Sequence, residues 1–255
     1  MAAPMKRRPL QGVWTVIRFN WHLHAIALLS IAALSVAAGC LTGYASAAAA
    51  ALAAGAALSL LSSLFATWLA YDAGGLYHME WLAAFIGEPR RAANIHAGFD
   101  ETTPLLVAAF PRTEWRIFDF YQPAKHTEIS IRRARQAHPP APGTVAIQPE
   151  NIPLADAALD TAVLFLAAHE IRDHRERVGF FRELKRVLAP GGRVIVTEHV
   201  RNPANIAAYS IGAWHFHTRS DWLAAFHGAG LRVVREFRNN PFITTFVLAS
   251  DENTH

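Results

Sequence analysis

The segment FRELKRVLAPGGRVIV, residues 181–196, combines three signals that together decide the fold. Its first half continues an amphipathic pattern that predicts a helix over residues 175–188. Pro190 ends this helix because proline interrupts helical hydrogen bonding, and the two glycines after it allow the positive φ that a tight reversal needs. Residues 193–197 are then expected to form a strand. The segment therefore predicts a helix that turns back at once into a sheet.

Strand and helix patterns alternate on both sides of this segment. The uninterrupted apolar run at 159–167 is typical of a central strand buried on both faces, as parallel sheets require. The expected strands are 92–96, 115–119, 144–148, 159–167, 193–197, 231–237 and 243–249. The expected helices are 103–109, 128–137, 175–188 and 220–229, the last with Ser220 as its N-cap. This order predicts an α/β fold with a mostly parallel seven-stranded sheet, helices on both faces, and ligands bound beyond the carboxyl ends of the strands.

Residues 25–71 contain no Asp, Glu, Lys, Arg or His over 47 positions. A membrane-spanning helix needs about 20 apolar residues, so this stretch predicts two transmembrane helices, at about 25–41 and 47–71, that reverse at residues 42–44. A cleaved signal peptide and a buried hairpin of a soluble protein are the alternatives. A signal peptide has an apolar core of only about 7–15 residues, which favours the hairpin. We therefore expect a membrane anchor at 1–78 and an α/β domain at 79–255.

The basic residues predict how this hairpin is oriented. Lys6, Arg7, Arg8 and Arg18 precede it, Arg90 and Arg91 follow it, and the turn between its helices carries no charge. Because Lys and Arg concentrate on the cytoplasmic side, the α/β domain is expected there, on a multi-pass protein of a bacterial-type inner membrane. Basic residues form no run of five, so no nucleic acid is expected as a partner. The single Cys40 excludes an internal disulfide and a zinc–cysteine cluster.

Three blocks of the α/β part resemble one enzyme class. They are IPLADAALD at 152–160 with the strand after it, the segment at 181–196, and residues 220–231. In this order and spacing they are similar to class I S-adenosylmethionine-dependent methyltransferases, particularly the group that modifies small molecules and lipids. The resemblance spans about residues 92–249. It implies a Rossmann-like fold, S-adenosylmethionine as cofactor, and methyl transfer as the reaction.

The resemblance also implies which residues hold the cofactor. The loop after the first strand departs from the family pattern, because Asn94 replaces an acid, His96 and Asp100 replace two glycines, and only Gly98 is retained. An alternative role for Asp100 is to cap the N-terminus of the next helix. Asp119 matches the carboxylate that receives the ribose hydroxyls, and Gln148 matches the position facing the adenine amino group. The expected cofactor-binding residues are His96, Gly98, Asp100, Asp119, Gln148, Glu150 and Asn151.

Candidate catalytic residues follow the fourth and fifth strands, where the family's acceptor site begins. They are His169, Glu198 and His199. A histidine, with an ordinary pKa near 6.5, can act as a base at neutral pH. A zinc site made of His215 and His217 with His199 or His169 is an alternative use of the same residues, but a spacing of two in a loop is unspecific, and we assign no metal.

Together these features predict a membrane-tethered S-adenosylmethionine-dependent methyltransferase. Its acceptor is expected to be a lipophilic small molecule, methylated on oxygen or carbon at the cytoplasmic face, with membrane lipids as further partners. The altered cofactor loop leaves open a non-catalytic, methyltransferase-like membrane scaffold or binding module. A nicotinamide dehydrogenase is disfavoured, because no G-x-G-x-x-G follows the first strand. The sequence does not determine the oligomeric state.

Overall fold

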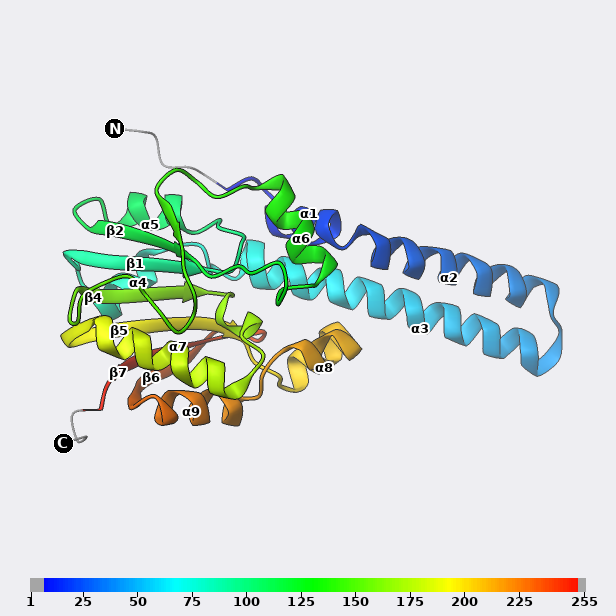
Figure 1. The fold of residues 1–255 in the computed structure, drawn as a ribbon. Helices are drawn as coiled ribbons and strands as arrows, with labels where there is room; N and C mark the ends of the chain where they lie inside the picture. Colours follow the sequence, from blue (N-terminus) through cyan, green and yellow to red (C-terminus); the bar gives the residue numbers. More distant parts are fainter. Residues whose placement is uncertain (1–6, 252–255) are drawn as a thin grey trace.

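A seven-stranded sheet forms the centre of the α/β domain in the computed structural model, which describes residues 7–251 (Figure 1). The strands are β1 (Arg91–His96), β2 (Glu114–Asp119), β3 (Thr144–Ala146), β4 (Leu159–Phe165), β5 (Leu188–His199), β6 (Leu231–Asn240) and β7 (Ile243–Ser250). Their order is β3-β2-β1-β4-β5-β7-β6, parallel from β3 to β5, with β7 antiparallel to both neighbours. From β1 the chain adds strands β2 and β3 on one side, and β4 and β5 then follow on the other side. Open α/β sheets bind their ligands at such a point, where the strand order reverses.

Helices cover both faces of this sheet, as predicted. One face packs on α7 (His174–Val187) and α9 (Arg219–Gly228). The other packs on α4 (Glu80–Ile86), α5 (Thr103–Ala109) and α8 (Pro203–Tyr209). Helix α6 (Ile129–Ala137) and the short 3-10 turns η2 (Ala168–Glu170) and η3 (Ser210–His215) complete the domain. The predicted fold class is confirmed.

Several local boundaries differ from the sequence prediction, and three of the differences have a clear cause. Strand β5 begins at Leu188 rather than at residue 193, because the Pro-Gly-Gly turn is an irregularity inside its pairing with β4, with Gly191 at φ 79°. Strand β4 ends at Phe165, since the next residue adopts φ 51°. The cap of α9 is Thr218 rather than Ser220, because Thr218 and Asp221 form a reciprocal capping box.

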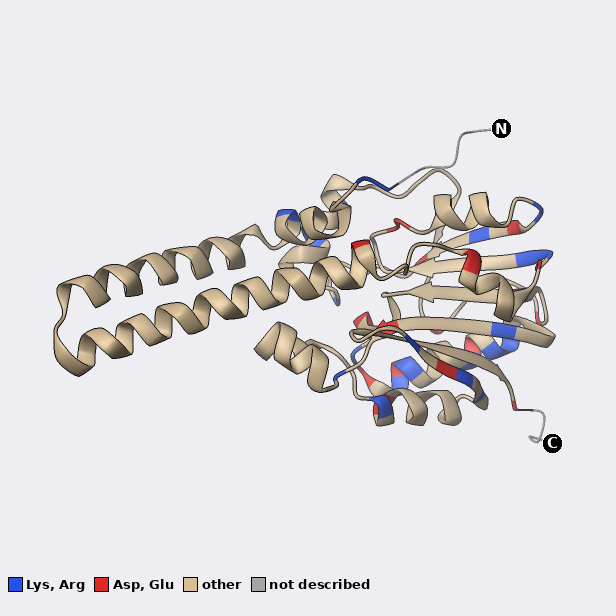
Figure 2. Ribbon diagram, turned by 180° about the vertical axis from the view of Figure 1, so that it is seen from behind, with Lys and Arg blue, Asp and Glu red and all other residues tan. Residues whose placement is uncertain are grey.

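The apolar stretch forms two long helices that extend away from the domain (Figures 1 and 2). They are α2 (Trp21–Cys40) and α3 (Gly43–Trp68), and α3 continues as a π-helical turn, η1 (Leu69–Ala73). Helix α2 begins earlier than the predicted residue 25, because His22 and His24 near the domain also adopt helical structure. Helix α3 begins earlier than the predicted residue 47, because the turn at the far end of the hairpin contains only Leu41 and Thr42. The two spans, Trp21–Cys40 and Gly43–Ala73, are long and apolar enough to cross a membrane. In the most apolar 18 residues of each span, 0% of the first and 11% of the second are buried inside the protein.

The end of this hairpin is packed into the α/β domain. Ala66 and Ala70 belong to the same buried cluster as Val163 of β4 and Ile195 of β5. Helix α1 (Gln11–Phe19), which the sequence reading did not predict, lies across the root of the hairpin (Figure 1). The boundary at residue 78 stays a prediction, and Lys6 lies outside the described residues.

Asp72 explains why α1 forms at this place. Its Oδ1 accepts the backbone N–H of Gly12 at 2.8 Å and its Oδ2 accepts that of Val13 at 3.0 Å. A carboxylate at a helix N-terminus satisfies otherwise unpaired N–H groups and complements the helix dipole. Since the cap comes from a residue 60 positions away, no local signal in the sequence marks the start of α1.

Candidate functional site

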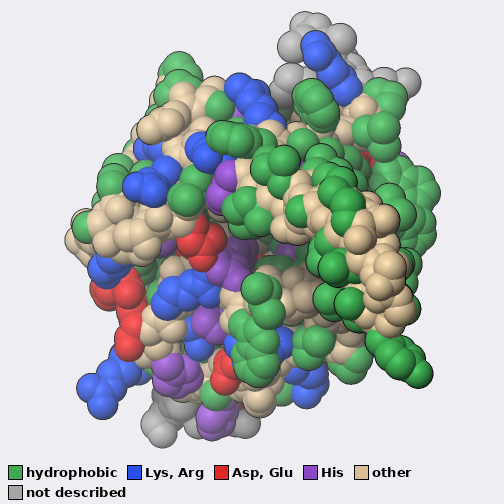
Figure 3. All heavy atoms as spheres, turned by 90° about the vertical axis from the view of Figure 1, so that its right-hand side faces the viewer, with side chains coloured by type: hydrophobic (Ala, Val, Ile, Leu, Met, Phe, Trp, Pro, Cys, Tyr) green, Lys and Arg blue, Asp and Glu red, His purple; other side chains and the backbone are tan. Residues whose placement is uncertain are grey.

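A cavity of about 240 Å³ opens at the carboxyl edge of the sheet. Its walls come from α1, the hairpin end, the loop after β1, α6, and the ends of β4 and β5. The lining residues are Gly12, Thr15, Val16, Phe19, Asn20, Tyr71, Tyr77, Ala97, Phe99, Glu101, Thr102, Ser130, Ile131, Ala134, Phe165, Leu166, His169, Glu170, His199 and Phe216. Seen along the hairpin, histidine, glutamate and arginine side chains gather beside its apolar surface (Figure 3). The cavity therefore combines apolar walls with titratable groups.

His169 and Glu198, two of the predicted catalytic residues, form a hydrogen-bonded pair in the cavity wall. The Nδ1 atom of His169 lies 2.7 Å from Oε2 of Glu198, whose side chain is fully buried. Oε1 of Glu198 accepts the backbone N–H groups of Ala167 and His169 at 3.0 and 3.2 Å. The turn η2 after β4 thus places His169 directly against the end of β5.

The charge of His169 follows from its two carboxylate neighbours. Burial acts to lower the pKa of His169, but Glu198 and Glu170 outweigh it and raise the pKa to about 10. For Glu170, burial acts to raise the pKa, whereas His169 outweighs it and lowers the pKa to about 2. At neutral pH His169 is therefore an imidazolium, which can donate hydrogen bonds but cannot take up a proton as a base.

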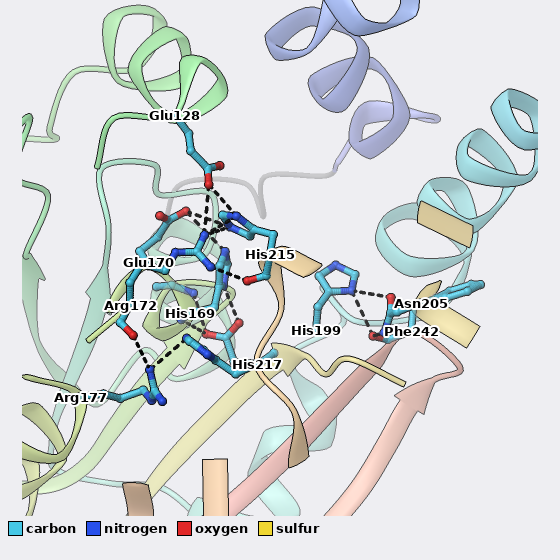
Figure 4. Close-up of polar contacts among 12 residues, drawn as sticks. Glu128, His169, Glu170, Arg172, Arg177, His199, Asn205, His215, His217 and Phe242 are labelled. Atoms are coloured by element: carbon cyan, nitrogen blue, oxygen red, sulfur yellow. Dashed lines mark hydrogen bonds and ion pairs between the residues drawn. The ribbon is translucent and has the colours of Figure 1, made fainter. Parts of the chain in front are cut away.

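His199 is the neutral histidine of the site (Figure 4). Its Nδ1 lies 3.1 Å from the carbonyl oxygen of Phe242, which can only accept, so Nδ1 carries the proton. Its Nε2 then accepts from the hydroxyl of Tyr71 at 2.7 Å. Burial and the charge of His169 lower the pKa of His199 to about 3. Phe216 stacks on the ring, with centroids 4.6 Å apart.

The structure does not form the three-histidine arrangement considered from the sequence. His217 lies 3.1 Å from Nη1 of Arg177 and packs against Trp222, away from the cavity. His215 instead approaches Glu170, with Nε2 to Oε1 at 3.9 Å. Figure 4 shows His169, Glu170 and His215 on one side of the site and His199 on the other.

In the loop after β1, the side chains that replace the family's acid and glycine interact with each other. Nδ2 of Asn94 donates to Oδ1 of Asp100 at 3.2 Å and to the hydroxyls of Thr102 and Thr103 at 3.0 and 2.7 Å. Oδ1 of Asp100 also accepts the backbone N–H groups of Thr102 and Thr103 at 3.0 and 2.9 Å. Asp100 therefore caps the start of α5, and neither it nor Asn94 lines the cavity.

Asp119 ends β2 and is 3% exposed. Its Oδ1 accepts the N–H groups of Gly98 and Tyr121, both at 2.9 Å, and its Oδ2 forms an ion pair with Arg135. Gly98 has φ 87°, and a Cβ there would come within 2.9 Å of the Tyr121 ring, so this position needs glycine. The structure thus brings Gly98 and Asp119 together, and their binding of the cofactor stays a prediction.

His96 lies next to this pair, with Nδ1 3.7 Å from Oδ1 of Asp119. It is 4% exposed, and neither of its ring nitrogens has a hydrogen-bond partner. Burial lowers the pKa of His96, so the ring is neutral at pH 7. A buried ring with two unpaired nitrogens is unusual, and it leaves hydrogen-bonding capacity for a polar ligand at this turn.

The three residues expected at the adenine lie farther out. Gln148, Glu150 and Asn151 are exposed and do not line the cavity. Gln148 accepts a hydrogen bond from Nε2 of Gln122 at 2.6 Å and pairs through its backbone with Asn151. Their assignment to the cofactor stays a prediction.

A family model matches part of the α/β domain. Residues 125–196 match the family described as "Methyltransferase domain". This chain carries a class I methyltransferase domain. The cofactor of the methyltransferase is S-adenosylmethionine, and its chemistry is methyl transfer. No curated protein matches the chain.

Solved structures agree with the methyltransferase fold. The PH0226 protein from Pyrococcus horikoshii OT3 is 11% identical, with 71% of this chain and 91% of that chain covered and a TM-score of 0.53. Human N-acetylserotonin methyltransferase, solved in complex with S-adenosylmethionine, is 12% identical, with 75% of this chain and 55% of that chain covered and a TM-score of 0.51. At such identities the likeness shows the fold alone.

The residues at this turn suit the cofactor in type, whereas in this structure both oxygens of Asp119 are engaged by Gly98, Tyr121 and Arg135. Asp119 supplies two acceptor oxygens at the end of β2, as a ribose diol requires, and His96 supplies unpaired nitrogens at the adjoining loop. Arg135 holds Oδ2 of Asp119 and the cavity does not reach this carboxylate. Binding of the adenosine portion therefore requires Arg135 to release Asp119.

Two features of the site were missed from the sequence. Tyr71 ends the uncharged apolar stretch, and nothing in its position in the sequence indicates His199 as a partner. Glu170 follows His169 directly, and a carboxylate next to a candidate catalytic histidine is the signal that could have identified it.

Proposed function

We propose that this methyltransferase is tethered to a membrane by its hairpin and methylates a lipophilic small molecule at the cytoplasmic face. One observation carries the proposal: Tyr71, in the last turn of the second apolar helix, lines the same cavity as His169 and donates a hydrogen bond to His199. The segment that would cross the membrane is therefore also a wall of the candidate active site.

The surface of the hairpin supports the tether. None of the residues of α2 is buried, and exposed leucine, isoleucine and valine side chains extend along it, among them Ile26, Leu28, Leu29 and Val36. Such a contiguous apolar surface is rare on soluble monomers. Charged residues are confined to the domain and to the root of the hairpin (Figure 2). By the distribution of Lys and Arg, the α/β domain lies on the cytoplasmic side.

The cavity supports a lipophilic acceptor. Phe19, Phe99, Phe165, Leu166 and Phe216 supply apolar walls, and titratable side chains, among them His169 and His199, line the same cavity. Binding sites of this composition take a ligand with an apolar body and one polar group, which the polar residues orient. A tether adds to this, because it confines the site to the surface where such a ligand is concentrated.

The chain's own residues can move the proton of the acceptor. When bound, S-adenosylmethionine supplies an electrophilic methyl group. An acceptor hydroxyl that donates to Tyr71 can pass its proton to the tyrosine oxygen while Tyr71 passes its own to Nε2 of His199. Since the pKa of His199 is about 3, its Nε2 carries no proton at neutral pH and can accept the hydrogen bond from Tyr71. An acidic carbon can lose its proton by the same path.

Two measurements on the full chain in lipid nanodiscs test this function. Calorimetry should show saturable binding of S-adenosylmethionine. With membrane extracts and isotopically labelled S-adenosylmethionine, the label should enter products that partition into organic solvent. Label found only in water-soluble products would overturn the lipophilic acceptor.

A membrane scaffold without catalytic activity is the second candidate. The ion pair between Arg135 and Asp119 favours it, because it occupies the carboxylate that the ribose would need. Absence of saturable S-adenosylmethionine binding in the calorimetric experiment would support this candidate and exclude the enzyme.

A further inference from the structure

Three side chains outside the proposed proton path converge at the polar end of the cavity. His169 and Glu170 belong to the turn after β4, and His215 ends the 3-10 turn η3. One donor atom from each lies within 4.8 Å of the others. We propose that His169, Glu170 and His215 bind a single divalent transition-metal ion. The metal binding itself does not depend on the proposed function.

The distances within this cluster are close to those of a coordination shell. Nε2 of His169 lies 3.5 Å from Oε1 of Glu170, and Nε2 of His215 lies 3.9 Å from the same oxygen. Ligand atoms about 2.1 Å from a tetrahedral zinc ion lie about 3.4 Å from one another. Two of the three ligand pairs therefore need to close by only a few tenths of an ångström. The two imidazole rings, with centroids 5.2 Å apart, must turn toward each other.

Both histidines are oriented by carboxylates in the way that metal ligands are. Nδ1 of His169 lies 2.7 Å from Glu198, and Nδ1 of His215 lies 2.6 Å from Glu128. Histidines that bind a metal usually donate their other ring N–H to a carboxylate or carbonyl, which fixes the tautomer and turns the free nitrogen toward the ion. Here this arrangement directs Nε2 of His169 toward Glu170, whereas Nε2 of His215 is contacted by Arg172, which must move before an ion can bind (Figure 4).

The donor set identifies the class of metal. Two imidazole nitrogens and one carboxylate oxygen suit zinc and its first-row neighbours, whereas magnesium and calcium prefer oxygen ligands. Three protein ligands also leave coordination positions open, which is typical of catalytic rather than structural zinc sites. Because His169 and Glu170 line the cavity, an open position faces the space for the acceptor. A polar oxygen of the acceptor is the ligand that this position would take.

Arg172 is a positively charged group that must move away from His215 before a metal ion can bind. Its guanidinium contacts the ring and the carbonyl oxygen of His215. It also lies 3.1 Å from Glu128, so it retains a carboxylate partner when it moves from the ring. Glu128, Glu170 and Glu198 surround the site, and the ion replaces the Nε2 proton of His169. The negative charge at the site therefore favours a cation.

Metal stoichiometry of the full chain tests the proposal. The protein in nanodiscs is stripped with a chelator, incubated with Zn²⁺ and freed of excess, and metal is measured by mass spectrometry. Co²⁺ is then titrated, because its visible absorption reports tetrahedral nitrogen and oxygen ligands. We expect about one Zn²⁺ per chain, and at least tenfold weaker Co²⁺ binding after Glu170→Gln or His215→Ala. Glu198→Gln should weaken binding about 10- to 100-fold.

The matched control is His217→Ala, two residues from His215 but paired with Arg177. It should leave the Co²⁺ spectrum unchanged, which separates the cluster from adventitious binding by the 13 histidines of the chain. If His215→Ala fails to fold, the Co²⁺ titration of the nearly isosteric variant Glu170→Gln still tests the proposed site. Less than about 0.2 Zn²⁺ per chain, or equal loss in His217→Ala, would overturn the proposal. Neither result depends on whether methyl transfer occurs.

Discussion

The hydroxyl of Tyr71 lies 2.7 Å from Nε2 of His199, although 128 positions separate them in the sequence. Tyr71 comes from the end of the second apolar helix and His199 from the end of β5. This contact joins the hairpin to the candidate active site. It also makes the role of the hairpin measurable by a single substitution.

Tyr71→Phe removes the hydroxyl and keeps the ring. Because the proposed proton path passes through this oxygen, kcat should fall at least about tenfold, within the range that positioned acid–base groups contribute, while S-adenosylmethionine affinity stays the same. Steady-state kinetics and calorimetry measure the two effects. Tyr209→Phe is the control, since its ring lies 5.7 Å from that of His199 but does not line the cavity. An unchanged kcat in Tyr71→Phe would exclude the proton path.

Stability should depend on pH through His169. Its pKa in the folded protein is about 10 against an ordinary 6.5, so its contribution is complete below pH 6.5 and is lost as the pH rises toward 10. Thermal unfolding from pH 6 to 10 should therefore show a falling Tm. His169→Gln should flatten this dependence. A slope of the same size in the variant would contradict the assignment of the charge to His169.

His199 should produce the opposite trend in acid. Its pKa of about 3 in the folded protein means that the unfolded chain binds more protons between pH 6.5 and 3, so stability falls as the pH decreases through this range. Glu170, with its pKa near 2, adds to the loss below pH 4.5. Unfolding of His199→Asn should show a smaller decrease between pH 6.5 and 4.5, where Glu170 contributes little.

Arg135→Gln should strengthen S-adenosylmethionine binding. The substitution removes the ion pair that occupies Oδ2 of Asp119 and leaves this oxygen free for a ribose hydroxyl. Arg132→Gln, on the exposed side of the same helix, is the control and should leave affinity unchanged. Asp119→Asn should weaken binding. Calorimetry would refute the prediction if Arg135→Gln bound more weakly than the wild type.

Gly12→Ala should loosen α1. A Cβ at Gly12 would come within 2.4 Å of Cβ of Tyr71, so the helix must shift from the hairpin. Overpacking of this kind costs about 1–3 kcal/mol, and the displaced Tyr71 should lower kcat as well. Gly39→Ala is a suitable control, because an added Cβ there meets no atom within 4 Å. Equal stability of the two variants in urea unfolding would contradict the packing argument.

The orientation of the hairpin can be tested by labelling. Tyr44 is 97% exposed at the turn farthest from the domain. In a Cys40→Ala background, Tyr44→Cys should react with an impermeant maleimide added outside intact cells. Val145→Cys, on β3 of the domain, should react only after lysis. The reverse pattern would place the domain on the other side of the membrane.

The sheet was predictable because its signals are local. The continuous apolar run that became β4 and the Pro-Gly-Gly segment of β5 each specify structure within a few residues of themselves. A mostly parallel sheet with helices on both faces also followed, because strands that alternate with helices form parallel sheets. Helix α1 was not predictable, because its N-terminal cap, Asp72, lies far away in the sequence.

The site was predictable in position but not in chemistry. The structure places His169 against Glu198, and His169 and His199 line the same cavity, at the ends of the strands from which the sequence analysis selected them. Their protonation could not be predicted, because it depends on which neighbours the fold supplies. Two carboxylates make His169 positive, whereas a buried apolar setting keeps the adjacent His199 neutral.

The π-helical turn Leu69–Ala73 places Tyr71 against His199 and Asp72 against the start of α1. A helix embedded in lipid tilts when its apolar length exceeds the thickness of the bilayer. Any tilt of α3 would pivot at this turn and pull on both contacts together. The thickness and composition of the surrounding membrane would then act on the enzyme as an effector does, by changing how often the catalytic groups are aligned.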